Sequence, residues 1–133
     1  MSNIEVTTNQ TNGIRIWEPI HKDDLVTLAG ADVLPAGTIL ARDSVSLNLV
    51  LFVKGGTTTG NGIPKAVIDY GFTATGAGTF SVRALVGGRI RAADLVIDAD
   101  GDATNVDAAV LDQLRDFGLV GLSTAQLSTL DNQ

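Results

Sequence analysis

The chain has 133 residues, of which 44% are hydrophobic and 18% are charged, with one His and no Cys. This length suits a single domain, and without Cys the chain can form neither a disulfide nor a thiolate metal site. Nine Lys and Arg residues against fifteen Asp and Glu residues give a net charge of −6, which disfavours contact with nucleic-acid phosphates. The composition therefore predicts one small folded domain that has no nucleic-acid partner.

No segment has the length or composition of a membrane span or a signal peptide. The longest strongly apolar run, residues 47–53, is far shorter than the ~20 residues that cross a bilayer. The first six residues, MSNIEV, lack the basic and apolar regions of a signal peptide. We therefore expect a protein that is made in the cytoplasm and has no membrane partner.

Residues 1–24 are expected to form an extended N-terminal arm. Two stretches that alternate apolar and polar residues, 4–6 and 14–17, flank a polar segment rich in turn-forming residues. Such an arm can pair as a strand but has few apolar neighbours of its own. Trp17, the only Trp of the chain, is suited to anchor the arm on a partner, and the alternative is that it packs on the chain's own core.

Residues 25–90 are typical of short β-strands that are separated by Gly-rich turns. Residues 47–53 are apolar at nearly every position, which indicates a strand buried on both faces or an element at a contact between subunits. The candidate oligomer contacts are its alternate apolar residues, Leu47, Leu49, Leu51 and Val53. Residues 54–62 hold four Gly but no Gly-Lys-Ser/Thr ending, so we expect a flexible surface loop rather than a phosphate site.

Asp98, Asp100 and Asp102 alternate in the pattern most like a metal site. An EF-hand loop that begins at Asp98 needs Gly and Glu at the positions that hold Ala103 and Ala109, so the match fails where a calcium loop is most demanding. A solvated turn is expected here, and a weak site for a hard cation is the alternative. No metal ligand and no cofactor are assigned.

A helix is predicted near residues 105–117, with Asn105 as the N-cap and Gly118 after its end. The residues expected to face the core share one side of this helix: Val106, Ala109, Val110, Leu114 and Phe117. A second short helix is expected over residues 123–130. The predicted fold is mainly β with one or two short C-terminal helices, in which residues 25–133 form one compact β-sandwich or barrel-like domain.

Catalytic groups are scarce. A single His21 would need Ser and Asp partners from elsewhere in the fold to act in a hydrolase, and we expect it to be a surface residue. No catalytic residue is assigned, and the chain is not expected to be an enzyme.

No single motif of the sequence is diagnostic, but the order of its segments indicates a protein family. The segments concerned are residues 25–30, 34–40, 62–67, 81–90 and 108–119, which follow the polar arm. This arrangement resembles the head decoration proteins of tailed bacteriophages, the lambda-type family. The resemblance implies a structural virion protein on the capsid exterior that binds the major capsid protein as a homotrimer and stabilises the capsid by bridging neighbouring subunits.

The same resemblance implies an arm that adds a strand to a capsid-protein sheet. The strand and anchor positions would be Ile4, Val6, Ile14, Ile16 and Trp17. Two alternatives stay open. One is another virion component such as a fibre or tail part, and the other is a small metal-dependent binding module or hydrolase built around His21 and the segment 98–102.

Overall fold

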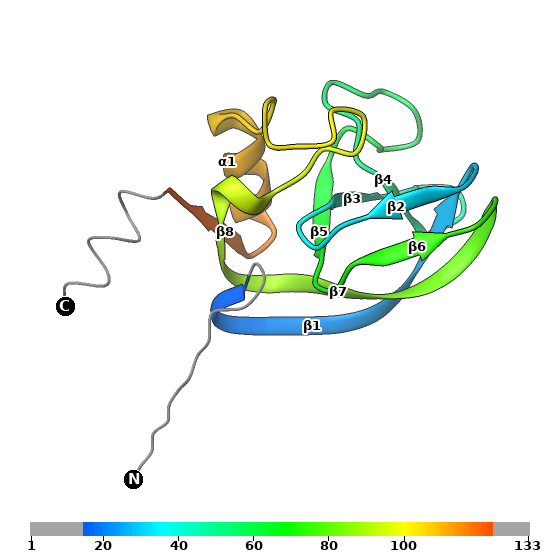
Figure 1. Cartoon of the computed structure of the whole chain (residues 1–133). Coiled ribbons are helices and arrows are strands. Elements are labelled where there is room, and N and C mark those ends of the chain that lie inside the picture. Colours follow the sequence, from blue (N-terminus) through cyan, green and yellow to red (C-terminus); the bar gives the residue numbers. More distant parts are fainter. Residues whose placement is uncertain (1–14, 124–133) are drawn as a thin grey trace, which may run out of the picture.

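The computed structural model describes the backbone of residues 15–123 and the side chains of residues 19–123. Its main element is a six-stranded sheet in which five strands close into a barrel, because the first and last of them also pair with each other (Figure 1). In order around the barrel these strands are β1 (Arg15–Leu28), β4 (Leu49–Leu51), β3 (Ile39–Arg42), β5 (Pro64–Ile68) and β7 (Gly78–Arg91). The prediction of a mainly β, barrel-like domain is confirmed.

The remaining elements flank this barrel. Strand β8 (Leu119–Leu122) extends the sheet by pairing in parallel with the end of β7, and β2 (Asp32–Leu34) and β6 (Phe72–Ala74) form a separate two-stranded sheet. A 3-10 turn, η2 (Ala92–Asp94), follows β7, and α1 (Ala108–Asp116) precedes β8. The second expected helix, at 123–130, lies almost entirely outside the described residues.

The barrel strands bury residues on both faces, so the protein has two apolar cores. On β5, Ala66 and Ile68 belong to one core and Val67 to the other. The first core includes residues of β1, β3, β4 and β7, and β2 and β6 add to it: Val26, Leu28, Leu34, Leu40, Leu49, Ala74, Val82 and Ala84. Alternation along each strand therefore sends neighbouring side chains into different cores.

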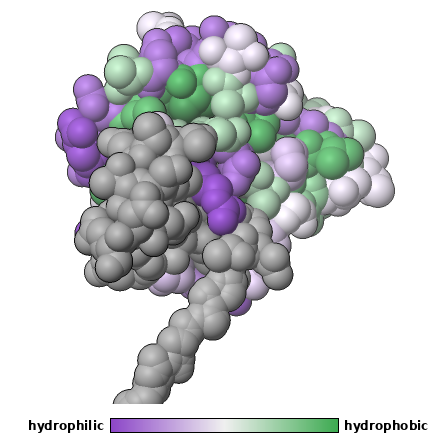
Figure 2. Space-filling view, turned by 60° about the vertical axis from the view of Figure 1, so that its left-hand side comes forward, coloured by the Kyte–Doolittle hydropathy of each residue, from purple (hydrophilic) through white to green (hydrophobic). Residues whose placement is uncertain are grey.

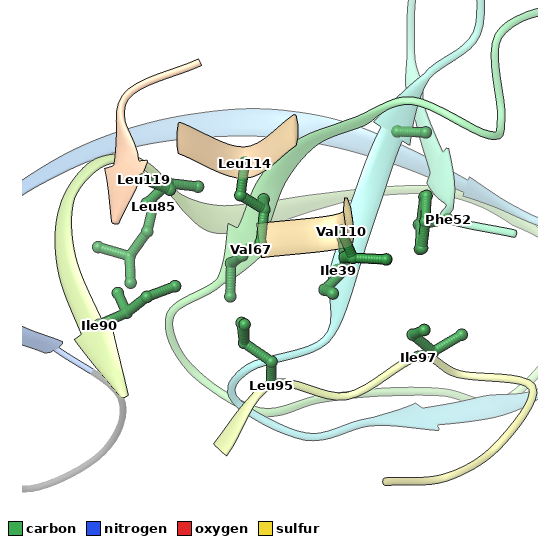
Figure 3. Close-up of a cluster of buried hydrophobic side chains, with 11 residues drawn as sticks. Ile39, Phe52, Val67, Leu85, Ile90, Leu95, Ile97, Val110, Leu114 and Leu119 are labelled. Atoms are coloured by element: carbon green, nitrogen blue, oxygen red, sulfur yellow. The ribbon is translucent and has the colours of Figure 1, made fainter. Parts of the chain in front are cut away.

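The second core lies between the barrel strands, α1, β8 and the segment after η2 (Figure 3). Val110 and Leu114 of α1 point into it, as do Leu95 and Leu119. The N-cap of α1 is Asp107, not the predicted Asn105, since the Asp107 carboxylate accepts a hydrogen bond from the Val110 amide at 3.1 Å. Ala109 and Phe117, which were expected to face the core, are exposed.

The start of the domain differs from the predicted division. Strand β1 crosses the boundary placed between residues 24 and 25, and residues 15–24 pair with β7 in the sheet. Of the proposed arm positions, Ile16 and Trp17 therefore belong to β1. Ile4, Val6 and Ile14 lie outside the described residues.

The apolar run 47–53 is not one long strand. Only Leu49–Leu51 form β4, and Leu47 adopts a left-handed backbone conformation with φ +65°. A turn causes this, because the Asp43 carboxylate accepts hydrogen bonds from the amides of Val45 and Ser46. Leu47 is 67% exposed and Val53 43% exposed, whereas Leu49 is fully buried. Leu49 thus has no surface to offer to another subunit.

Candidate docking surface

The longest pairing in the molecule joins β1 to β7, and we call these two strands the β1–β7 ribbon. The antiparallel register runs from Arg15 opposite Ile90 to Leu28 opposite Gly78, with irregularities between Arg15 and His21. On its other edge β1 pairs only with β4, at Val26. In the part of the chain that the structure describes, no strand pairs with this edge from Arg15 to Leu25. The N-terminal half of β1 is therefore an open sheet edge.

An apolar hollow lies at one end of the ribbon. It has a volume of about 220 Å³ and is lined by Ile20, Gly88, Arg89, Gly118 and Val120. Ile20 is 59% exposed. Its place depends on Gly87, the residue opposite it on β7, because a Cβ on Gly87 would lie 2.9 Å from the Ile20 Cδ1 atom. Gly118 has φ +99°, which closes α1 and turns the chain into β8.

A second hollow, of about 240 Å³, is lined by charged residues of the ribbon: His21, Lys22, Asp23 and Arg83. The Nε2 atom of His21 lies 2.9 Å from Oδ2 of Asp69, whose side chain is only 2% exposed. The Arg83 Nε atom lies 3.6 Å from the same oxygen. His21 thus lies at the surface, as expected, but it is half-buried: its side chain is 19% exposed and contacts a buried carboxylate.

Sequence reasoning missed this contact because the partners are far apart in the chain. Asp69 directly follows β5, its amide donates to the Arg83 carbonyl, and His21 lies opposite Leu85 on the other side of β7. The pairing of three strands brings the two side chains together. No spacing between residues 21 and 69 carries that information.

Charge is divided unevenly between the ribbon and the rest of the chain. The β1–β7 ribbon holds five of the nine Lys and Arg residues but only three of the fifteen Asp and Glu residues, a net charge of +2. The rest of the chain carries −8. Residues 92–107, which we call the acidic segment, hold five Asp and neither Lys nor Arg. The ribbon is thus the positive part of an acidic protein.

The acidic segment lies on the opposite side of the barrel from β1 (Figure 1). Partial burial and the neighbouring Asp32 carboxyl raise the pKa of Asp98 to about 6. Asp100 and Asp102 have local partners, because they accept hydrogen bonds from the Asn105 side chain and the Thr104 amide. Among the described residues, no group of three or more His, Asp or Glu side chains is placed to hold a metal ion.

The surface also bears exposed apolar side chains. Figure 2 shows hydrophobic residues in patches bordered by hydrophilic ones on the face it presents. On the ribbon, Ile20 and Leu25 are exposed, and Leu47 and Val45 are exposed on the turn before β4. No helix among the described residues is long and apolar enough to span a membrane.

Comparison with known protein families identifies the family of this chain. Residues 18–119 match the family of the bacteriophage lambda head decoration protein D. The chain belongs to this family. The predicted resemblance is confirmed, and the family makes the chain a structural component of a phage head that associates with the virion and binds the capsid. No curated protein matches the chain.

Proposed function

We propose that this decoration protein binds the outer surface of an assembled phage capsid and stabilises it by bridging neighbouring subunits of the major capsid protein. A protein that binds the assembled shell but not its separated subunits shifts the assembly equilibrium by mass action. Many symmetric copies make this effect cumulative. The chain carries out no reaction in this role, which agrees with a family of structural proteins.

The open edge of β1 is the observation that carries the proposal. Residues 15–25 have an edge without a partner strand in the described chain, and residues 1–14 continue directly from it. An open edge of this kind can pair with a strand of another protein. In such a pairing, backbone hydrogen bonds supply the affinity and alternate side chains fix the register. The alternation at Ile4 and Val6 suits the same pairing.

We propose further that the protein acts as a homotrimer. A three-fold assembly needs two different surfaces on each copy, because each subunit presents one patch to the next. The exposed residues of the 47–53 segment, Leu47 and Val53, are the candidate contacts, together with the half-buried Leu51. Leu49 is left out of this set because it lies in the core.

Co-sedimentation with assembled capsids tests the proposal. Full-length protein is expected to pellet with capsids that lack decoration protein, and a variant without residues 1–14 is expected to pellet far less while its melting temperature stays unchanged. Failure of the full-length protein to pellet with heads, with binding to tails or fibres instead, would identify it as a different virion part. Equal pelleting of both forms would remove the arm from the mechanism.

Limited proteolysis gives a second readout. Residues 1–14 are expected to be cleaved in the free protein and to become protected on capsids. Cleavage sites in residues 15–28 are expected to be protected in both states, since this strand pairs with β7. Equal cleavage of residues 1–14 with and without capsids would count against docking through the arm.

A further inference from the structure

Strand β8 has one face against α1 and one face that points away from it. Leu119 is fully buried in the second core (Figure 3), and a Cβ at Gly121 would lie 2.7 Å from Cδ2 of Leu111 on α1. Because side chains alternate along a strand, Val120 and Leu122 stand on the opposite face. Both residues are half-buried. The outer face of β8 therefore carries two apolar side chains that point away from α1.

This outer face continues across β7 to β1. Val120 lies opposite Arg89 on β7, and both residues line the apolar hollow of about 220 Å³ together with Ile20 of β1. Gly88 and Gly118 also line the hollow, and neither has a side chain to fill it. Since β7 runs between β1 and β8, Ile20 and Val120 flank the hollow from two sides.

A segment of the same chain begins directly beside this face. Residues 124–133 follow Ser123, which is the residue after β8. They contain two Leu residues three positions apart, Leu127 and Leu130, and one charged residue. On a helix such as the one predicted over residues 123–130, residues three positions apart share one face. The segment thus has a pair of apolar side chains suited to an apolar surface.

The lengths of strand and helix suit a return of this segment over the hollow. From Val120 to Ser123 a strand rises ~3.3 Å per residue and covers about 10 Å. From Ser123 to Leu130 a helix rises ~1.5 Å per residue and also covers about 10 Å. A helix that turns back along β8 therefore brings Leu130 level with Val120, with Leu127 about one turn before it.

We propose that residues 124–133 cover the outer face of β8 in the free protein, with both Leu side chains packed over the hollow and Leu130 against Val120. This packing removes apolar surface of the segment and of the sheet from water. The family match ends at residue 119, so the cover lies beyond the part of the chain that matches the family. The C-terminal residues act as a structural element of the domain and leave residues 1–14 for the capsid contact proposed above.

The first test compares two double variants of the expected helix, each with two substitutions to Gln. Leu127→Gln with Leu130→Gln changes the face that meets β8, whereas Ala125→Gln with Thr129→Gln changes the opposite face and is the control. In thermal melts of the whole chain, the first variant is expected to melt about 3–10 °C below the parent. The control should melt within about 2 °C of the parent. Equal melting temperatures of the two variants would overturn the proposal.

A double-mutant cycle tests whether Leu130 contacts the hollow itself. Val120→Ala and Leu130→Ala are made singly and together. If the two side chains are in contact, the effect of the pair differs from the sum of the single effects, here by at least about 2 °C in melting temperature. Additive effects would place Leu130 elsewhere on the domain and contradict the proposal.

Other occupants of this face would give different results. If the effect of Val120→Ala depends on the presence of residues 1–14 and not on Leu130, the N-terminal segment covers the hollow instead. If Val120→Ala leaves the melting temperature unchanged but weakens co-sedimentation with capsids, or self-association in sedimentation velocity, the face binds the capsid protein or a second copy. Each of these results overturns the proposal and leaves the decoration role intact.

Discussion

The Nε2 atom of His21 lies 2.9 Å from Oδ2 of Asp69, and this contact links strands that are not neighbours. His21 is on β1, Asp69 directly follows β5, and β7 runs between them. Arg83 of β7 approaches the same oxygen at 3.6 Å. One buried carboxylate at the end of β5 therefore contacts side chains of both β1 and β7.

Removal of this carboxylate should loosen the ribbon. Asp69→Ala is expected to lower the free energy of unfolding by about 1–3 kcal/mol, because His21 and Arg83 lose the buried carboxylate that both of them contact. Urea denaturation measures the loss. Asp116→Ala, a change at an exposed carboxylate on α1, is the control and should shift stability by less than about 0.5 kcal/mol. Equal effects of the two changes would show that the contact contributes nothing to stability.

Much of the fold could be predicted because it follows from local patterns. Short runs of β-favouring residues between Gly-rich turns gave the β class, and the apolar spacing of Val110 and Leu114 gave the helix and its buried face. The left-handed Gly118 after α1 was also predictable, since a helix commonly ends at such a residue. These features depend on neighbours within about one turn or one strand.

The errors arise where long-range pairing decides the structure. Residues 15–24 have no core pattern of their own, yet they join the sheet because β7 supplies a partner strand as long as β1. Residues 47–53 have the pattern of a long strand, but the hydrogen bonds of Asp43 turn the chain before β4 begins. His21 meets Asp69 only once three strands have paired. Composition and spacing do not contain these contacts.

The loop after β4 is closely packed, and this packing leads to a further prediction about stability. Val53 donates its amide hydrogen to the Asn61 carbonyl, and a Cβ on Gly62 would overlap the Gly56 carbonyl oxygen. Gly62→Ala should therefore destabilise the protein by about 1–3 kcal/mol in a urea titration. Gly30→Ala is the matched control, since a Cβ there meets nothing within 4 Å, and it should leave stability within about 1 kcal/mol of the parent. An equal response of both variants would mean that the loop gives way at little cost.

The raised pKa of Asp98 predicts that its contribution to the stability of the folded protein falls as pH rises, which is the reverse of the usual behaviour of a carboxyl group. Burial and Asp32 raise this pKa from 3.8 to about 6, so between these pH values the folded protein binds more protons at Asp98 than the unfolded chain does. The contribution of Asp98 to stability therefore falls as pH rises from about 4 to about 6. Asp98→Asn should be more stable than the parent at pH 7, by on the order of 1 kcal/mol after allowance for solvent screening.

Chemical denaturation at pH 4, 5, 6 and 7 measures this difference. The gain from Asp98→Asn should shrink toward pH 4, where the parent carboxyl is protonated in the folded state. Asp24 acts in the opposite direction: a hydrogen bond from Arg42 lowers its pKa, so its contribution is lost as pH falls below about 4. Comparison of variant with parent at each pH removes this shared effect. A gain that is the same at pH 4 and pH 7 would contradict the raised pKa.

Leu47 is exposed and Leu49 is buried, so substitutions at these two positions test a subunit contact and core packing separately. Leu49 is fully buried in the first apolar core, so Leu49→Ala should lower the free energy of unfolding by about 2–5 kcal/mol in urea denaturation. Leu47 is 67% exposed with φ +65°, so Leu47→Gly should leave the stability of the monomer unchanged or raise it by up to about 1 kcal/mol. If Leu47 lies at the trimer contact, the same change will reduce trimer formation on capsids, as measured by the occupancy of three-fold positions in electron-microscopy maps. Full occupancy with Leu47→Gly would place the trimer contact elsewhere on the surface.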